Sequence, residues 1–421
     1  TDGGPLPCGA MASGVRAAQP VMGGNEARAR AAQVARDSYG RLLSILTARA
    51  GDIELAEDVL SDALLEALHR WPEQGIPTNP EGWILTVARN RGRDVLKSAH
   101  HHRSVPLDAT HEAGIDDLLE AFDPDAIPDE RLALLFACAH PAIDSTARTP
   151  LMLQVVLGLD ARAIAQAFNI RHTTMAQRLV RAKRRIRDAG IPLAIPSQQE
   201  MPPRLAAVLE AIYGAYAADH WLTSAPDVRT TLAAEALELA TILATLLPDE
   251  PEALGLAALL SLSLARADER WRTGAYVPLS EQDPTRWDRA LIARGESYLH
   301  RAASHRRFGR FQLEAAIQSA HCARLFSGDT DWAAIVRLYQ ALLQIAPTLG
   351  AQVGYAAALA SYGGAAAGLA ALDALPAEST RRFQPAWATR AHLLALLERQ
   401  TEASMAYDRA IALTTDPLIR R

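Results

Sequence analysis

Apolar side chains recur every three to four residues along most of this chain, which is the spacing of one face of an α-helix. Residues 53–69 show the pattern well, because Val59, Ala63 and Ala67 recur at helix spacing. The carboxylates of this segment, among them Asp58, Asp62 and Glu66, lie largely between the apolar positions and give the helix an acidic outer face. Residues 83–103 form a second amphipathic segment, whose polar side is basic. The pattern predicts helices packed on helices, that is, an all-α fold.

Proline and glycine mark the expected ends of these first helices. The pair Trp71-Pro72 is expected to end the helix that contains residues 53–69, and residues 73–82 (EQGIPTNPEG) are expected to form a loop. Within that segment, Asn79 and Pro80 suit the N-cap and the first turn of the next helix.

Charge and proline divide the chain into larger parts. Residues 108–130 carry nine Asp and Glu and neither Lys nor Arg, which is typical of a linker. The N-terminal residues contain GAMASG, which resembles a cloning scar, and have no signal-peptide pattern. We expect, in chain order, a disordered or foreign N-terminus (1–25), a first helical domain (26–103), an acidic linker (104–128), a second helical domain (129–192) and a helical C-terminal domain (193–421).

The last third of the chain shows a pairing of apolar segments. The expected helix pairs are 311–326 with 331–345, 348–361 with 363–375, and 382–398 with 400–413. Their period of roughly 34 to 38 residues lies in the range of helical-hairpin repeats. The segment AYDRAIAL (406–413) has the spacing of small and aromatic side chains that is found where paired helices stack. We therefore predict a tetratricopeptide-like C-terminal domain.

Composition narrows the class of protein. Of the 421 residues, 49% are apolar and 5% aromatic, and the formal net charge is -5. No long apolar run is free of charged residues, so no membrane span is expected. The three cysteines are too widely spaced for a disulfide framework, which fits a reducing cytosol and predicts a cytoplasmic protein.

The most informative segment is ARAIAQAFNIRHTTMAQRLVRAKRRIR, residues 161–187. It predicts a helix, a tight turn and a second helix. The expected apolar core of this pair is Ile164, Ala165, Phe168, Ile170, Met175 and Leu179. The segment has eight Arg and Lys and no Asp or Glu, although the chain is net acidic. A basic second helix after a short turn suits duplex DNA; the alternative is an ordinary basic surface helix.

Other candidate chemistry is weaker. The histidines at 100–102 are adjacent on a predicted helix and point in different directions, so no metal site is expected. Cys138 and Cys322 each lie beside a histidine but lack a third orienting group, so we assign them structural roles. The motifs GxGxxG, GxxxxGK[ST], HExxH, GxSxG and CxxC do not occur. We expect no catalytic residues, no cofactor and no enzymatic activity.

Three segments, taken in order, resemble an extracytoplasmic-function sigma factor. These are small bacterial transcription initiation factors with two helical domains joined by a flexible linker. The segments are AEDVLSDALLEALHRW (56–71), PEGWILTVARNRGRDVLKSAHHHR (80–103) and LGLDARAIAQAFNIRHTTMAQRLVRAKRRIRDAGIP (157–192). Together with DERLALLFACAHPAI (129–143), the chain is similar to the subgroup with a long C-terminal helical extension. The sigma resemblance covers residues 26–192.

The resemblance implies two partners, core RNA polymerase and promoter DNA. It places the acidic helix on the polymerase, residues 73–82 and the next helix on the −10 element, and the linker toward the active cleft. The implied polymerase contacts are Asp58, Asp62 and Glu66. The implied −10 contacts are Trp83, Arg89, Asn90, Arg93 and Lys97. Gly92 inside this helix departs from the family pattern and leaves the direction of Arg93 open.

The resemblance also places the basic helix pair on the −35 duplex. The implied contacts are Arg171, His172, Thr173, Thr174, Gln177, Arg178, Arg181 and Arg185. Gln177 and Arg178 are the implied base-edge readers, and Lys183, Arg184 and Arg187 the implied phosphate contacts. The extension is expected to regulate polymerase binding or promoter opening, and it leaves room for a regulatory protein or peptide.

Three alternatives stay open. The first is a helix-turn-helix regulator whose repeat domain senses a ligand and which never joins the polymerase. The others are a repeat scaffold with merely basic surface helices, and an enzyme hidden in the extension. Residues 26–103 favour the sigma factor, because a plain regulator has no need of both an acidic docking helix and a second basic helix.

Overall fold

The computed structural model describes residues 24–102, 127–168, 170–197, 199–218, 226–272 and 275–414. The described residues are predominantly helical, apart from connecting turns and one two-residue antiparallel pair, β1 (Trp271–Arg272) with β2 (Ala275–Tyr276). The all-α prediction is thus confirmed. Nearly all of the predicted N-terminal segment 1–25 and of the predicted linker 104–128 lies outside the described residues.

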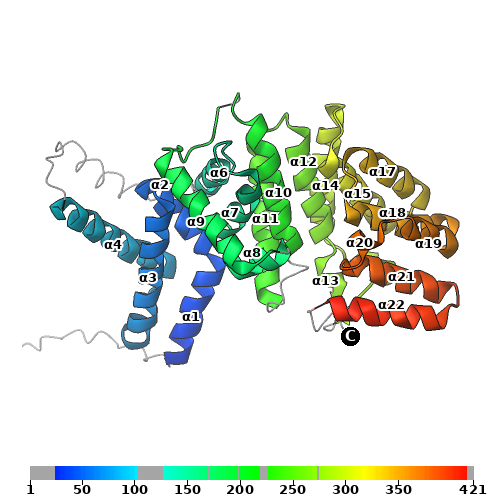
Figure 1. Ribbon diagram of the computed structural model, residues 1–421, viewed down its shortest axis with the longest axis horizontal. Coiled ribbons are helices and arrows are strands. Elements are labelled where there is room, and N and C mark those ends of the chain that lie inside the picture. Colours follow the sequence, from blue (N-terminus) through cyan, green and yellow to red (C-terminus); the bar gives the residue numbers. More distant parts are fainter. Residues whose placement is uncertain are drawn as a thin grey trace, which may run out of the picture. The chain divides into compact units, whose positions relative to one another are not determined.

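The first part of the chain is built of helices (Figure 1). Before residue 103 these are α1 (Gly24–Asp37), α2 (Tyr39–Ala50), α3 (Ile53–Gln74) and α4 (Pro80–His102). Between residues 127 and 188 they are α6 (Ile127–Cys138), α7 (Ser145–Val155), α8 (Ala161–Ala167) and α9 (His172–Asp188).

The rest of the chain is a series of further helices. Up to residue 304 the elements besides the strand pair are α10 (Pro202–Ala218), α11 (Pro226–Leu246), α12 (Pro251–Leu264), α13 (Ala267–Arg270), the 3-10 turns η3 (Leu279–Glu281) and η4 (Pro284–Arg286), and α14 (Arg289–Ser304). After residue 304 they are α15 (Arg310–Cys322), α16 (Arg324–Ser327), α17 (Trp332–Ile345), α18 (Leu349–Gly363), α19 (Ala365–Asp373), α20 (Ala377–Thr380), α21 (Gln384–Leu396) and α22 (Gln400–Leu413).

The described residues divide into two compact units that do not follow chain order. One unit contains residues 24–38 and 58–102, and the other contains residues 39–57 and everything from 127 onward. Helix α2 and the first turn of α3 therefore pack with the later helices. The domain boundaries predicted from the sequence remain predictions.

Helix α3 runs further than the sequence suggested. The prediction that Trp71-Pro72 ends it is wrong, because the helix continues through Gln74. Pro72 has a helical φ but lacks the N–H that would bond the carbonyl of Leu68, and only two more helical residues follow it. The helix ends instead at Gly75, whose φ of 84° is in the left-handed region. The predicted start of α4 is confirmed, since the Gly82 amide donates to Asn79 Oδ1 at 2.9 Å.

Apolar packing in the first unit centres on two tryptophans. Trp71 is buried, and its ring meets Trp83 edge-on at a centroid distance of 5.6 Å. Ile84, one residue further along α4, is fully buried. Val95, an apolar residue later in α4, is 49% exposed. The apolar face of α4 is therefore covered mainly along its first half.

In the second unit, α2 packs closely on α6 and α7. Leu42 and Leu43 are buried in this interface. Gly40 faces the end of α7, where a Cβ on Gly40 would lie only 1.6 Å from the carbonyl oxygen of Val156. The absence of a side chain at Gly40 thus lets the two backbones meet, and it fixes α2 against the bundle of α6–α9.

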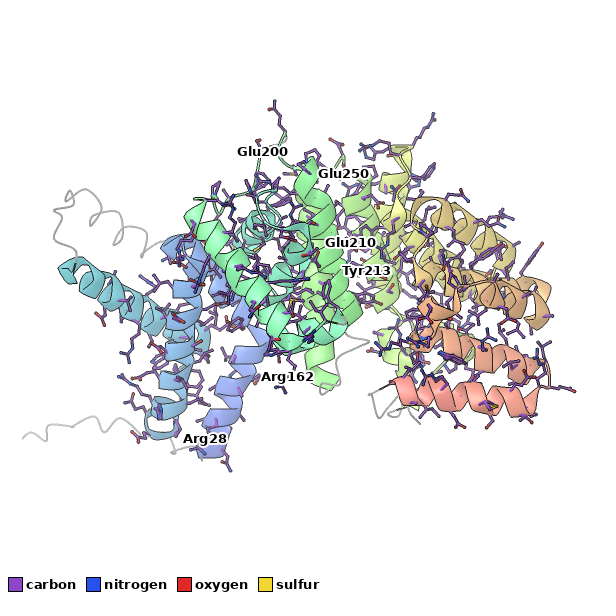
Figure 2. The ribbon with its side chains drawn as sticks, in the orientation of Figure 1. Arg28, Arg162, Glu200, Glu210, Tyr213 and Glu250 are labelled. Carbon is purple, nitrogen blue, oxygen red and sulfur yellow. The ribbon has the colours of Figure 1, made fainter. Side chains whose placement is uncertain are left out.

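The extension begins by packing on that bundle, because α10 contacts α6 and α7. Further along, Arg310 on α15 is held by α10. Its guanidinium pairs with Glu210 at 2.5 Å and with Glu314 at 2.8 Å, and it lies 4.9 Å from the centroid of the Tyr213 ring. Figure 2 shows Glu210 and Tyr213 on α10. These contacts make the start of the extension continuous with its later helices.

The later helices form contacting pairs, as the apolar pattern indicated. Helix α15 contacts α17, α18 contacts α19, and α21 contacts α22. Helices α21 and α22 lie side by side (Figure 1). The pairing of helices is confirmed, and the tetratricopeptide-like assignment remains a prediction.

Candidate nucleic-acid interface

Helices α8 and α9 contact each other across a short turn. Asp160 begins α8 by accepting hydrogen bonds from the amides of Arg162 and Ala163, at 2.8 and 2.7 Å. Helix α9 begins after Arg171, whose side chain makes no capping bond. The N-terminal amides of α9 are therefore not covered by an acidic cap.

The apolar core of this helix pair is close to the prediction. Ile164, Met175 and Leu179 are at most 1% exposed. Phe168, predicted as a core residue, is 41% exposed, so that prediction is wrong. Because α8 ends at Ala167, Phe168 lies past the helix and its side chain no longer follows the buried face.

The side chains predicted to contact the −35 duplex all lie at the surface. Exposed positions are Arg171, His172, Thr173, Gln177, Arg181 and Arg185. Thr174 and Arg178 are half-buried. The buried face of α9 is instead Met175, Leu179, Ala182, Lys183 and Ile186. Helix α9 thus presents a polar surface along its length, and the role of these side chains in DNA contact remains a prediction.

One side of α9 carries three arginines that share a pocket with the single carboxylate of Asp144. Arg178, Arg181 and Arg185 line an open pocket of about 460 Å³ together with the start of α7. Arg181 Nε donates to the carbonyl of Gln177 at 3.3 Å, and Arg185 Nε to the carbonyl of Ala142 at 3.4 Å. Within the described part of the chain, no ion pair involves these three guanidinium groups. Asp144 offsets part of the charge of Arg178, and the remaining positive charge of this side is available to an anion.

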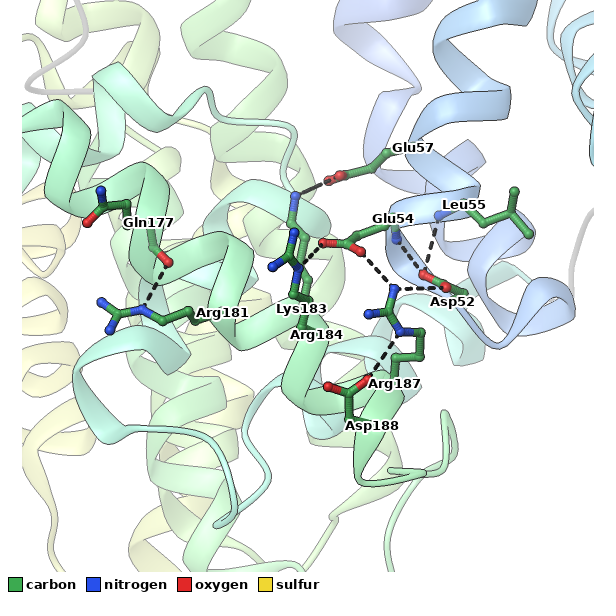
Figure 3. Close-up of polar contacts among 10 residues, drawn as sticks. All are labelled: Asp52, Glu54, Leu55, Glu57, Gln177, Arg181, Lys183, Arg184, Arg187 and Asp188. Atoms are coloured by element: carbon green, nitrogen blue, oxygen red, sulfur yellow. Dashed lines mark hydrogen bonds and ion pairs between the residues drawn. The ribbon is translucent and has the colours of Figure 1, made fainter.

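The opposite side of α9 carries cations that are already paired (Figure 3). Lys183 Nζ donates to both carboxylate oxygens of Glu57, at 2.6 and 2.7 Å. Arg187 Nη1 lies 2.8 Å from Glu54, and Arg184 Nε lies 3.6 Å from the same carboxylate. These pairs were not predicted, because periodicity within one helix does not indicate which distant side chains it will meet. Lys183, Arg184 and Arg187 were instead predicted as phosphate contacts.

The residues predicted to contact the −10 element lie on α4, in mixed surroundings. Trp83 is half-buried against Trp71, Asn90 is exposed, and Arg89 and Arg93 are half-buried with partners of their own. The side chain of Lys97 lies outside the described residues. The structure brings Trp83, Arg89, Asn90 and Arg93 onto one helix, and their role in DNA contact remains a prediction.

The residues predicted to contact polymerase lie along α3. Asp58 and Asp62 are exposed. Glu66 is half-buried and accepts from Arg70 Nε at 2.6 Å, with Arg91 Nη2 at 3.8 Å. Glu66 thus has cationic neighbours that the sequence pattern did not indicate, while the other two carboxylates face solvent.

The two described cysteines are buried and unreactive in character. Burial raises the pKa of Cys138 to about 12 and that of Cys322 to about 11, so both thiols are held in the protonated form. No group of three or more metal-binding side chains gathers among the residues that the structure describes. The predicted cluster of histidines at 100–102 lies outside the described side chains. No described helix combines the length and the apolar character needed to cross a membrane.

Comparisons with known proteins match two parts of the chain. A family model described as sigma-70 region 2 matches residues 34–101, and a family of unknown function (DUF6596) matches residues 204–303. An uncharacterised protein of Rhizobium meliloti (strain 1021) is 36% identical over 371 residues, which are 87% of this chain and 87% of that protein. A "probable RNA polymerase sigma factor RfaY" of Xanthomonas campestris pv. campestris is 27% identical over 174 residues, which are 38% of this chain and 42% of that protein. No solved structure matches significantly.

Proposed function

The chain belongs to the same family as its uncharacterised Rhizobium meliloti relative and is a sigma-70-family protein, and from this premise we propose that it is a transcription initiation factor. In this proposal it binds core RNA polymerase and directs it to specific promoters. The observation that carries the proposal is the combination of a sigma-70 region 2 with a second bundle whose helix α9 has an exposed basic surface.

Helix α9 suits the reading of duplex DNA. Gln177 and Arg178 have the donor and acceptor geometry that recognises adenine and guanine edges in the major groove. Arg171 and Thr173 lie at the N-terminus of α9, where free amides and the helix dipole favour a phosphate. Arg181 and Arg185 continue the positive surface along the helix and would hold the DNA backbone.

Helix α4 suits the capture of a single strand. Trp83 stands near the start of the helix and is braced by Trp71, so an unstacked base would meet a rigid aromatic surface. Asn90 is exposed two turns further along and can hydrogen-bond a base or a sugar. Asp58 and Asp62 on α3 are the exposed carboxylates that we assign to polymerase docking.

The extension is suited to act on the bundle that carries α9. Arg131 on α6 is 3% exposed and pairs with Glu235 at 3.1 Å and with Glu238 at 3.0 Å, both on α11. Burial raises the pKa of the Glu235 carboxyl, while the Arg131 guanidinium opposes that rise. An interface of this kind does not form and break easily, because an unpaired buried charge is strongly unfavourable. We infer that the extension regulates initiation by moving together with α6–α9.

Run-off transcription with core polymerase and the full chain tests the initiation proposal. The template carries the chain's own upstream region. Truncation after Pro196 is avoided, because α10 covers α6 and α7 and its removal would expose their apolar side chains. Arg178→Ala should lower specific initiation, whereas the control Arg337→Ala, at an exposed position on α17, should not. If the chain does not bind core polymerase, the initiation proposal is wrong and a helix-turn-helix regulator replaces it.

A second experiment tests regulation by the extension. The double variant Arg131→Met, Glu235→Gln removes the buried charges of the α6–α11 contact together. We expect it to change the amount of run-off transcript without changing affinity for core polymerase. Arg289→Met, at an exposed position on α14, is the matched control. Unchanged transcript in the double variant would contradict regulation through this interface.

A further inference from the structure

Three carboxylates at the start of α3 form ion pairs with the basic side chains on one side of α9. Glu57 forms an ion pair with Lys183, and Glu54 forms ion pairs with Arg187 and Arg184. Asp52 Oδ2 lies 3.6 Å from Arg187 Nη1. All six side chains belong to the same compact unit. Figure 3 shows the three carboxylates on one side and the three basic side chains on the other, facing each other.

The pair between Lys183 and Glu57 is the most enclosed of these contacts. The Lys183 side chain is 7% exposed and that of Glu57 is 20% exposed. An ammonium group has three donors, and Glu57 accepts from Lys183 through both of its oxygens. Lys183 therefore has little capacity left for a phosphate oxygen while Glu57 is in place.

The acidic segment is held beside α9 by packing as well as by charge. Gly40 on α2 meets the backbone of Val156, and Tyr39 packs against Gly158, whose φ is 66°. After α2 the chain turns at Asp52, whose Oδ1 accepts from the amides of Glu54 and Leu55 at 2.8 and 3.3 Å. Asp52 thus both begins α3 and faces Arg187, so the start of α3 is a preformed acidic surface.

The chemistry of this surface is that of a DNA backbone. Carboxylate and phosphate oxygens are the same kind of anionic acceptor for lysine and arginine, so one cation cannot serve both at full strength. A phosphate approaching Arg184 or Arg187 would also meet the charges of Glu54 and Asp52, which repel it. Duplex DNA can use these three cations only after the start of α3 has moved away.

We propose that Asp52, Glu54 and Glu57 form an autoinhibitory contact, in which this segment competes with DNA phosphates for Lys183, Arg184 and Arg187. The inference rests on the proposed function, because it assigns α9 to duplex DNA. The three carboxylates lie inside the sigma-70 region 2 match, residues 34–101. Any event that engages this segment elsewhere would therefore release one side of α9 for DNA.

Chemical cross-linking can trap the contact without a substitution. A water-soluble carbodiimide joins an adjacent amine and carboxylate as an amide, with loss of one water. The chain has only two lysines, Lys97 and Lys183, so the product is simple to map by mass spectrometry. We expect an amide between Lys183 and Glu57 in the free full-length chain. No such amide, while the chain is folded by circular dichroism, would overturn the inference.

DNA binding of the cross-linked chain then tests autoinhibition. We compare it with a Lys183→Arg chain treated with the same reagent, which keeps the charge but cannot form the amide. The cross-linked chain should bind promoter duplex more weakly and with a shallower dependence on salt, because three phosphate contacts account for a slope of about 2.7 in log K against log salt. Equal affinity and equal slope in the two chains would overturn the inference.

Two further variants weaken the contact, whereas the cross-link traps it. Glu54→Gln with Glu57→Gln removes two carboxylates, and Glu26→Gln with Glu398→Gln removes two exposed carboxylates elsewhere as the charge-matched control. The first pair should bind duplex more tightly and with a steeper salt slope than the second. Gly40→Ala changes no charge but displaces α2 from Val156, and it should lower the yield of the Lys183–Glu57 amide and raise duplex affinity.

The outcomes separate this inference from the proposed function. If all chains bind duplex and core polymerase alike, the chain binds DNA as proposed but the carboxylates do not compete with phosphates. In that case the inference fails and the proposed function stands. If no chain binds duplex or polymerase, including those with the carboxylates removed, the proposed function and the inference fail together. Tighter binding only in the Glu54→Gln, Glu57→Gln and Gly40→Ala chains supports both.

Discussion

The two sides of helix α9 carry the same kinds of residue in opposite surroundings. Arg178, Arg181 and Arg185 line an open pocket, and no ion pair within the described residues neutralises them. Lys183 and Arg187, on the other side, meet carboxylates from a segment more than 120 residues earlier in the chain, 126 residues for Lys183. The side with Arg181 and Arg185 can bind an external anion, whereas Lys183 and Arg187 are already paired with carboxylates of the same chain.

The comparison shows that a count of positive residues does not measure capacity for DNA. A helix with six closely spaced cations offers its full charge only when no internal carboxylate competes for it. We therefore expect the paired side to matter for stability in the free chain and the open side to matter for DNA affinity. Substitutions that fall on one side or the other can separate the two effects.

The largest expected effect is on stability, on the paired side. Lys183→Met removes the buried ammonium group that pairs with both oxygens of the Glu57 carboxylate, and it should lower the free energy of unfolding by about 3 kcal/mol. Arg178→Met on the open side should change it by less than about 0.5 kcal/mol. Urea unfolding followed by circular dichroism measures both. Equal losses in the two variants would contradict the distinction between the two sides.

The next effect is on DNA binding, on the open side. Arg181→Ala removes an exposed cation without an ion-pair partner, and it should weaken promoter-duplex binding by about 1.5 kcal/mol, roughly tenfold. Arg184→Ala, three residues along and facing Glu54, should weaken binding of the free chain by much less. Fluorescence anisotropy with a labelled duplex provides the measurement. A larger loss in Arg184→Ala than in Arg181→Ala would reverse the assignment.

A smaller effect appears at alkaline pH, near the paired side. Burial, and secondly the negative charge of Glu57, raise the pKa of Tyr39 to about 12. The folded pKa is above the unfolded value of about 10, so the folded chain retains the proton and stability falls as pH rises from 10 to 12. Between pH 8 and pH 10.5 this tyrosine should cost about 0.8 kcal/mol. Tyr39→Phe should remove that part of the loss in unfolding measurements at the two pH values, and an unchanged loss would exclude Tyr39 as its source.

The smallest effect concerns the exposed edge of the paired side. Arg184 is 60% exposed and lies 3.6 Å from Glu54, so Arg184→Gln should lower stability by less than about 0.5 kcal/mol. The difference should vanish at high salt, since exposed pairs are screened. Thermal unfolding at low and high salt checks this, and a salt-independent loss would show that Arg184 stabilises the chain by packing instead.

Local pattern was sufficient for much of the fold and of the candidate interface. Helical periodicity predicted α3, α4, α8 and α9, and the buried residues Ile164, Met175 and Leu179 followed from it. The errors arose at helix ends. Pro72 lies within the last turn of α3, and Phe168 lies just past the end of α8 and is exposed. At such positions, neighbouring turns and not periodicity decide where the side chain lies.

The sequence by itself determined the helices, the basic character of α9 and the acidic start of α3, because each depends on residues close together in the chain. Only the tertiary structure decided that Glu57 meets Lys183 and that Arg131 meets Glu235. Both pairs span more than 100 residues, 126 and 104 respectively. They form because α2 packs on α6 and α7 and α11 packs on α6, and no local periodicity encodes that packing.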